Sequence, residues 1–178
     1  MTDDPLRALV RTIPDFPKPG IQFRDITTVV RDASAFSLAI DRMAAVLHGQ
    51  GITMIAGIEA RGFIFGAALA REMRLGFVPI RKKNKLPGPT IGISYALEYG
   101  EDRVEIHADA VGPDDRVALV DDLIATGGTA IAATRLLHRV GAAVPLAVFL
   151  VDLPDLGGAA LLRAEGPEVH SLLAFAGD

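Results

Sequence analysis

The chain has 178 residues, of which half are hydrophobic, none is cysteine and four are histidine, and its formal net charge is −4. This length suits one ordinary domain, and the acidic balance argues against general nucleic-acid binding, which relies on a basic surface. Disulfides and thiolate chemistry are excluded, and the scattered histidines do not form a metal-binding pattern.

Strands and helices alternate along most of the chain, which predicts an α/β domain with a parallel β-sheet flanked by helices. The first long helix has Ser34 available as its N-cap. The expected helices, in chain order, cover residues 34–48, 63–74, about 130–140 and about 155–164. The expected strands cover residues 52–58, 77–80, 117–121 and 146–151. Because no repeat, low-complexity tract or linker interrupts this order, we predict one domain over residues 1–178.

Residues 82 to about 109 differ in pattern from the rest of the chain. Glycines and prolines there lead into nearly alternating polar and apolar stretches around residues 93–99 and 104–107. Alternation of this kind is typical of half-buried strands rather than of helices or of strands buried on both faces. We therefore expect a long antiparallel excursion beside the parallel sheet.

The glycine turn after the apolar strand at 117–121 carries the clearest chemical signal. Gly127 and Gly128 can adopt backbone angles that other residues avoid, so consecutive N–H groups can converge on one anion at the positive end of the next helix. Thr126 and Thr129 add hydroxyl donors. The lysine of the nucleotide-triphosphate P-loop is missing, so the turn favours a monophosphate ester.

Two carboxylates, Asp121 and Asp122, precede this turn. They would repel a phosphate unless they faced something else, such as sugar hydroxyls or a divalent cation. Hydroxyls together with a phosphate indicate a ribose 5-phosphate. The simpler alternative is a buried strand that ends in two solvated aspartates and an ordinary turn.

Cationic side chains follow two other predicted strands. Arg61 lies between a strand and a helix, where its guanidinium can bind the paired oxygens of a diphosphate, although a surface position at a helix start is an alternative. The basic cluster at 81–85 is either a solvated loop or a second source of positive charge. Since ligands of open α/β sheets bind beyond the carboxyl ends of the strands, we expect these loops to meet the turn after Asp121.

Two further expectations come from the apolar content. No apolar run approaches the ~20 residues of a membrane helix, and the N-terminus, with Asp3 and Asp4, lacks the features of a signal peptide. We therefore expect a cytoplasmic protein that does not bind membranes. The high proportion of apolar residues leaves hydrophobic surface to be covered, which predicts a homo-oligomer.

Several of these segments resemble the type I phosphoribosyltransferases. The Ala-Thr-Gly-Gly-Thr form of the glycine turn is similar to that of the adenine-specific branch of the family. The likeness extends over nearly the whole chain from about Arg11. The segments that carry it are residues 16–27, 60–66, 81–88, 94–100 and 117–129.

This resemblance implies the type I phosphoribosyltransferase fold, with a small N-terminal base-binding hood over about residues 1–30 and a mobile lid over about residues 82–109. It implies transfer of the 5-phosphoribosyl group from 5-phosphoribosyl 1-diphosphate to adenine, which gives AMP and diphosphate in purine salvage. A homodimer is also implied, as is Mg²⁺ bound mainly through the diphosphate and ribose oxygens of the substrate rather than by dedicated protein ligands.

The resemblance also implies roles at the reacting end of the site. Asp121 and Asp122 would hold the ribose hydroxyls and stabilise a cationic transition state, and the turn with Ala125, Thr126, Gly127, Gly128 and Thr129 would bind the 5-phosphate. Arg61, Lys85 and Arg81 would bind the diphosphate, with Arg81 serving either its own site or that of a neighbouring subunit. Glu98 and Tyr99 would belong to the lid, with Glu98 handling the proton that adenine loses. The family tends to hold a non-proline cis peptide in the loop at 59–62.

For the base, the resemblance implies that Phe23 stacks on adenine, Gln22 contributes its main chain, Arg24 reaches a ring nitrogen and Leu123 lies on the other side of the ring. Gln22 departs from the apolar residue expected at its position, which a main-chain contact tolerates. Phe23 as an ordinary core residue is the alternative.

Two other functions compete with this prediction. A phosphoribosyltransferase for hypoxanthine, guanine or xanthine would share the phosphate turn, but the segment at 16–27 and Ala125 disfavour it. A non-enzymatic regulator that senses the ribosyl diphosphate would show a degraded lid or an added domain. Arg61, Lys85, Glu98 and Tyr99 are all present, and the chain has no spare domain.

Overall fold

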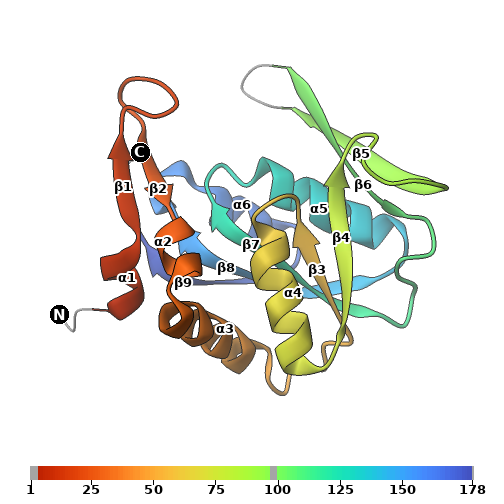
Figure 1. Cartoon of the computed structure of the whole chain (residues 1–178). Coiled ribbons are helices and arrows are strands. Elements are labelled where there is room, and N and C mark those ends of the chain that lie inside the picture. The colour runs from red at the N-terminus through yellow and green to blue at the C-terminus, as the bar shows by residue number, and fades with distance from the viewer. Residues whose placement is uncertain (1–3, 97–99, 178) are drawn as a thin grey trace.

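The computed structural model describes residues 4–96 and 100–177. A seven-stranded sheet lies between two layers of helices, and a separate two-stranded hairpin stands near the N-terminus (Figure 1). The hairpin consists of β1 (Arg11–Pro14) and β2 (Gln22–Asp25). The sheet consists of β3 (Met54–Ile58), β4 (Gly76–Lys82), β5 (Thr90–Ala96), β6 (Glu101–His107), β7 (Arg116–Ile124), β8 (Ala143–Asp152) and β9 (Glu168–Ala174). The helices are α1 (Pro5–Leu9), α2 (Thr27–Arg31), α3 (Ala33–Leu47), α4 (Gly62–Met73), α5 (Gly128–Arg139), the 3₁₀ turn η1 (Pro154–Leu156) and α6 (Gly158–Ala164).

Strand order explains where a ligand can bind. The sheet runs β5-β6-β4-β3-β7-β8-β9, and the five strands from β4 to β9 in this order are parallel. From β3 the chain first crosses to β4 on one side and later returns to β7 on the other. The switch point of this α/β sheet therefore lies between β3 and β7, and ligands of such sheets bind at the carboxyl ends of the strands there. The predicted α/β class with a parallel sheet is confirmed.

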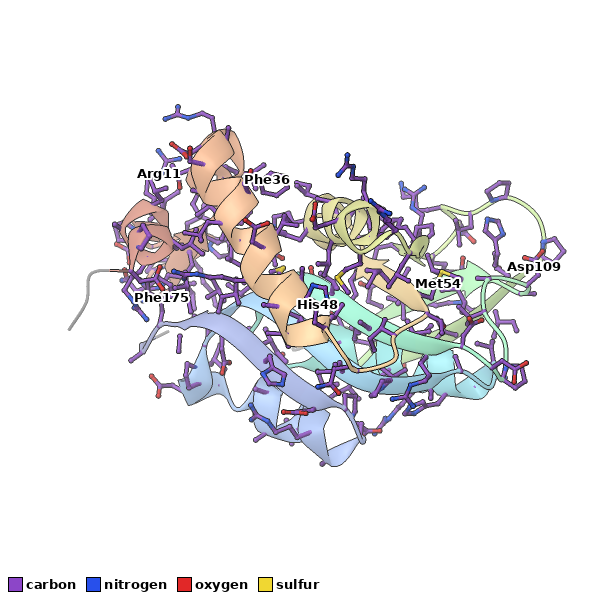
Figure 2. All side chains as sticks on the ribbon, turned by 90° about the horizontal axis from the view of Figure 1, so that it is seen from below. Arg11, Phe36, His48, Met54, Asp109 and Phe175 are labelled. Atoms are coloured by element: carbon purple, nitrogen blue, oxygen red, sulfur yellow. The ribbon has the colours of Figure 1, made fainter. Side chains whose placement is uncertain are left out.

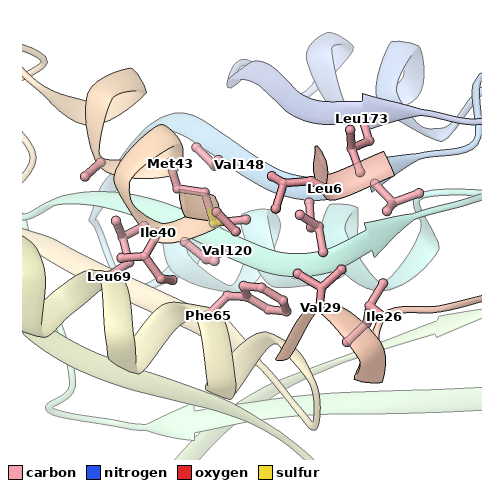
Figure 3. Packing of buried hydrophobic residues seen from close by; sticks show 14 of the residues in the cluster. Leu6, Ile26, Val29, Ile40, Met43, Phe65, Leu69, Val120, Val148 and Leu173 are labelled. Carbon is pink, nitrogen blue, oxygen red and sulfur yellow. The ribbon is translucent and has the colours of Figure 1, made fainter. Parts of the chain in front are cut away.

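Two apolar cores lie on opposite faces of the sheet. One packs beneath α1 to α4 and includes Met43 and Phe65, both fully buried (Figure 3). The other packs beneath α5 and α6. Figure 2, seen from below, shows α4 and α6 on opposite sides of the strands. Successive residues of β7 contribute to alternate cores, with Ala118 and Val120 in the first and Leu119 in the second, which explains why this strand shows no polar alternation.

The antiparallel excursion predicted from the alternating pattern is confirmed. β5 and β6 form an antiparallel hairpin in which Tyr95 is opposite Asp102, and β6 pairs with β4 through the register Lys82 to Val104. The β5–β6 hairpin is thus an antiparallel extension of the parallel sheet. Figure 1 shows it and the β1–β2 hairpin rising on the same side of the molecule. The mobility of the lid stays a prediction.

Several predicted boundaries were wrong. The cap of α3 is Asp32, whose Oδ1 accepts a hydrogen bond of 2.8 Å from the Ala35 N–H, so Ser34 lies inside the helix. The helix expected at about 155–164 is divided into η1 and α6 by Gly157, which has a positive φ. β9 was not predicted. In the parts of the chain that the structure describes, the helices are too short or too polar to cross a membrane.

Candidate active site

A cavity of about 780 Å³ opens at the switch point between β3 and β7. It exists because β7 extends beyond the end of β3. The two strands pair only as far as Gly57 and Val120, whereas β7 continues along β8 to the pair of Ile124 with Asp152. The last residues of β7 therefore have no strand on their β3 side. The cavity is lined by residues 58–61, residues 121–130, Lys82 and Tyr95.

The glycine turn has the geometry of an anion site. Gly127 has a φ of +82° and is the N-cap of α5, whose first residue is Gly128. Gly127, Gly128 and Thr129 line the cavity, so the positive end of the α5 dipole lies at the cavity wall and favours negative charge there. We call residues 125–129 the phosphate loop. The predicted loop residues Ala125, Thr126, Gly127, Gly128 and Thr129 all line the cavity, so the structure brings this whole group together.

The start of α6 supports the phosphate loop from behind. Gly158 donates a backbone hydrogen bond of 3.0 Å to the Ala125 carbonyl. A Cβ atom on Gly127 would lie 2.9 Å from the Gly158 carbonyl oxygen, closer than side-chain carbons approach, and its positive φ disfavours any side chain. Glycine is therefore required here both for the turn and for the contact with α6.

The acidic pair lies at the end of β7. Asp122 is only 3% exposed, and its Oδ2 lies 2.9 Å from Arg61 Nε. This contact is an ion pair without hydrogen-bond geometry, because Oδ2 has no hydrogen-bond partner among the residues that the structure describes. Asp121 Oδ1 accepts a hydrogen bond of 2.9 Å from the Asp122 N–H. A buried carboxylate oxygen that accepts no hydrogen bond within the described residues can accept one from a ligand hydroxyl.

Burial and mutual repulsion change the acidity of this pair. Burial raises the pKa of Asp121 well above its usual range, and the charge of Asp122 raises it further. Burial also raises the pKa of Asp122, although the Arg61 guanidinium opposes that shift. Carboxyls with raised pKa values are common where a protein is arranged to receive a ligand. The free protein therefore bears an electrostatic cost at this point that hydroxyl donors or a cation would relieve.

The loop before α4 closes tightly against Asp121. A Cβ atom on Gly62 would lie 2.7 Å from Asp121 Oδ1, so only glycine allows α4 to start at this distance from β7. The peptide bond between Glu59 and Ala60 is cis, a feature that the family tends to hold in this loop and that the sequence itself did not predict. Arg61 is the N-cap residue of α4, two residues beyond the Glu59 that follows β3, and it lies beside Asp122.

The two predicted diphosphate cations of the basic loop, Arg81 and Lys85, do not line the cavity. Arg81 donates from Nε to Glu59 Oε2 at 3.2 Å and from Nη2 to Glu59 Oε1 at 3.4 Å, and its Nη1 donates to the Lys85 carbonyl at 3.1 Å. Glu59 Oε2 also accepts the Lys82 N–H at 2.8 Å. Burial would raise the pKa of Glu59, but the hydrogen bonds from Lys82 and Arg81 lower it overall. In the free chain Arg81 is thus an ion-pair partner of Glu59.

Sequence reasoning missed Lys82, a second cation that lines the cavity together with Arg61. Lys82 is the last residue of β4, and Tyr95 of β5 lies beside it on the same cavity surface. Both fall in segments that carry the family resemblance, but nothing local distinguishes Lys82 from Lys83 or Lys85. Lys82 differs from the other two lysines because of the register in which β4 pairs with β6. The alternation of polar and apolar residues along these two strands could have suggested that register.

The predicted base-binding residues Gln22, Phe23 and Arg24 lie on β2 and do not line the cavity. The Phe23 ring is nevertheless near it, because the Arg61 guanidinium carbon lies 5.6 Å from the ring centroid. Phe16 contacts Phe23 edge to face, with ring centroids 5.1 Å apart. Leu123 lines the cavity, as predicted for the other side of the base.

Arg24 turns toward the C-terminal segment. Its Nη2 donates to the Ala176 carbonyl at 3.2 Å, and its guanidinium lies 4.9 Å from the Phe175 ring centroid. The structure therefore does not bring Arg24 to the cavity. Glu98 and Tyr99 lie outside the described residues. Within residues 4–96 and 100–177, no three acidic or histidine side chains gather as a metal-binding group.

Comparison with known proteins identifies the family. The phosphoribosyl transferase domain family matches residues 27–169. The adenine phosphoribosyltransferase of Bradyrhizobium sp. (strain ORS 278) is 60% identical over 172 residues, which cover 97% of this chain and 96% of that protein.

Solved structures agree with this assignment. The adenine phosphoribosyltransferase from Thermoanaerobacter pseudethanolicus aligns with a TM-score of 0.90 at 47% identity and covers 96% of this chain and 98% of its own. The enzyme from Giardia lamblia complexed with 9-deazaadenine aligns with a TM-score of 0.90 at 33% identity and covers 96% of each chain. With a glycine turn, an acidic pair and an arginine together at one switch point, the chain belongs to the phosphoribosyltransferase family, among the adenine phosphoribosyltransferases.

Proposed function

We propose that this protein transfers the 5-phosphoribosyl group from 5-phosphoribosyl 1-diphosphate to adenine, forming AMP and diphosphate. The observation that carries the proposal is the cavity in which the phosphate loop, the acidic pair and Arg61 meet. Each of the three suits a different part of one donor molecule: an anion site for the 5-phosphate, acceptors for the ribose hydroxyls and a guanidinium for the diphosphate.

The reaction places opposite charges on the two parts of the donor. As the bond from C1 to the diphosphate oxygen breaks, positive charge develops on the ribose and negative charge on the diphosphate. Asp121 and Asp122 stabilise the ribose, and Arg61 stabilises the leaving diphosphate. Adenine then bonds to C1 from the opposite face with inversion. Because the protein forms no covalent bond with the substrates in this scheme, most of the acceleration of the reaction comes from positioning the substrates and from stabilising the developing charges.

Recognition of the base is assigned to the β1–β2 hairpin, and transfer of its proton to Glu98. Phe23 stacks on adenine opposite Leu123, Gln22 offers its main chain, and Arg24 reaches a ring nitrogen after leaving the Ala176 carbonyl. Glu98 takes the proton that adenine loses, and Tyr99 closes with it over the substrate. The position of Phe23 beside Arg61 supports the stacking role.

Magnesium fits this site as an ion carried mainly by the substrate. The cavity offers the neighbouring carboxylates Asp121 and Asp122, and Glu59 is already paired with Arg81. Because Asp121 and Asp122 are assigned to the ribose hydroxyls, the ion would be held mainly by the diphosphate and ribose oxygens of the donor, close to these carboxylates. When bound with the donor, the ion would neutralise part of the charge of the diphosphate.

A homodimer and a cytoplasmic location belong to the same proposal. Ile64, on the first turn of α4 near Arg61, is 41% exposed, and a second subunit would cover it. In such a dimer, Lys85 and Arg81 bind the diphosphate, with Arg81 leaving Glu59 to act either in its own site or in the neighbouring one. Sedimentation at micromolar concentration, with Ile64→Glu as the variant, tests the assembly.

The central experiment is a panel of purine bases with 5-phosphoribosyl 1-diphosphate and magnesium, in which nucleotide and diphosphate are measured together. We expect AMP and diphosphate in equal amounts from adenine. Formation of IMP or GMP in place of AMP would show that the substrate is hypoxanthine or guanine and not adenine. No product from any base, together with tight binding of the donor, would instead favour a sensor of the ribosyl diphosphate.

A further inference from the structure

Lys82 is held from behind by two residues of the β5–β6 hairpin. Its Nζ donates to Asp102 Oδ2 at 2.5 Å and to the Tyr95 hydroxyl at 2.6 Å. Tyr95 and Asp102 are cross-strand partners, so their side chains reach Lys82 from one face of the hairpin. The ammonium therefore lies at a fixed place in the cavity lining.

The Tyr95 hydroxyl connects this lysine to the phosphate loop. It accepts a hydrogen bond of 3.0 Å from Thr129 Oγ1, and it donates its own hydrogen to Asp102 Oδ2 at 3.0 Å. With the bond from Lys82, one donor and two acceptor positions of the hydroxyl are all used. A continuous set of hydrogen bonds thus runs from Asp102 and Lys82 through Tyr95 to Thr129.

Charge and rigidity both follow from these bonds. Burial would lower the pKa of Lys82, but Asp102 and Tyr95 raise it above its ordinary value, so the side chain stays cationic. Lysine side chains are otherwise flexible, and a lysine that is already ordered loses less freedom when an anion binds. The network therefore prepares a positive charge at a defined distance from the phosphate loop.

We propose that Tyr95 and Asp102 are positioning residues that hold the Lys82 ammonium for the diphosphate of the donor and link it to the phosphate loop through Thr129. This inference rests on the proposed function, since it assumes a donor with a phosphate at each end. Lys82 contacts the substrate, whereas Asp102 and Tyr95 act through Lys82. If the Lys82–Asp102 ion pair had only a structural role, its loss would lower the stability of the protein and would not affect the KM of one substrate more than that of the other.

The first test compares Asp102→Asn with Glu101→Gln, which removes one carboxylate from the neighbouring, exposed position of β6. We expect Asp102→Asn to raise the KM for 5-phosphoribosyl 1-diphosphate about tenfold, the loss typical of one charge-assisted hydrogen bond. The KM for adenine should change less than about twofold, as should both values for Glu101→Gln. Equal changes in both KM values, or no change in either, would overturn the proposal.

A double-mutant cycle tests whether Asp102 acts through Lys82. In a Lys82→Met background, Asp102→Asn should add less than about twofold to the KM for the donor, because the group that it positions is gone. A full additional tenfold loss in that background would show that Asp102 acts independently and would contradict the inference.

Binding measurements separate this inference from the proposed reaction. Calorimetry with inorganic diphosphate and magnesium needs no turnover, so it remains informative even if the wild type forms no AMP. Tyr95→Phe should weaken diphosphate binding about threefold or more, whereas Ser94→Ala on the same strand should not. Thermal unfolding of each variant verifies folding. A folded Tyr95→Phe variant with wild-type diphosphate affinity would contradict the role of Tyr95.

Discussion

The two hairpins beside the cavity are attached to the protein in different ways. β5–β6 continues the central sheet through the backbone pairing of β6 with β4. β1–β2 is a separate sheet, and Arg24 of β2 ties it to the C-terminal segment by donating to the Ala176 carbonyl. Arg7 of the preceding helix α1 donates to the Ala174 carbonyl, and the guanidiniums of Arg7 and Arg24 both lie within 5 Å of the Phe175 ring centroid. The hairpin assigned to the diphosphate is thus placed by backbone bonds, and the hairpin assigned to the base by replaceable side chains. Base selectivity can therefore change without disturbing the phosphate chemistry.

The largest effect is expected on the β5–β6 side. Glu98→Ala should lower kcat about a hundredfold, the lower end of the range for loss of a general acid or base. The KM for either substrate should change much less, since Glu98 is assigned to proton transfer and not to binding. Steady-state kinetics measure both values. Full turnover by this variant would remove Glu98 from the mechanism.

On the β1–β2 side, Phe23→Ala should act on the base alone. Stacking of a base on an aromatic ring contributes about 1–3 kcal/mol, so the KM for adenine should rise about ten- to a hundredfold. The KM for 5-phosphoribosyl 1-diphosphate should stay within about twofold. Phe16→Ala is the matched control, because Phe16 packs against Phe23 with its ring at 79° to that ring and is not assigned a contact with the base, so its loss should have a much smaller effect. A similar rise in both KM values would mean that the two hairpins do not divide the substrates.

Between the hairpins, the acidic pair should show a conflict between stability and function. Because the pKa of Asp121 is raised in the folded protein, ionisation costs folding free energy as the pH rises above the ordinary aspartate value of 3.8. Asp121→Asn removes this cost and should stabilise the free protein at pH 7 by about 1 kcal/mol, or about 2–4 °C in Tm. The gain should fade as the pH falls toward 4. Thermal unfolding across this range measures it, and a lower Tm at pH 7 would contradict the electrostatic account.

The smallest effect is expected from the attachment of the β1–β2 hairpin. Phe175→Ala removes the ring that both guanidiniums contact, and an exposed cation–π contact contributes about 0.5–1 kcal/mol. With Arg24 less firmly placed, the KM for adenine should change about threefold, and the KM for the donor should not change. Leu161→Ala, which removes an exposed side chain of α6, serves as the control. No change in the KM for adenine would show that the C-terminal segment does not influence base binding.

Local sequence patterns predicted the elements that carry the chemistry. The apolar strand, the two aspartates and the glycine turn are contiguous, so β7, the phosphate loop and α5 followed from one segment. Boundaries were weaker where two residues offered the same signal: Asp32 and Ser34 both suit an N-cap, and the sequence alone does not choose between them. β9 was missed because this edge strand mixes polar residues with apolar ones.

Contacts between distant segments could not be predicted. Lys82, Tyr95 and Asp102 meet only because β4, β5 and β6 pair in a particular register, and a shift by one residue would direct their side chains to the other face. The attachment of Arg24 to the C-terminal segment likewise joins residues more than 150 positions apart. Such contacts depend on the assembled sheet rather than on local pattern.

The contact between Gly127 and Gly158 has a consequence for how sequence variants of this protein are interpreted. Gly158 does not line the cavity, yet a side chain there would collide with the backbone of the phosphate loop. A substitution at Gly158 would therefore behave in a genetic screen as a loss of donor binding, although Gly158 lies about 30 positions beyond the glycine turn in the chain and outside the five segments that carry the family resemblance. A classification of variants by their distance from the glycine turn along the sequence would therefore miss Gly158.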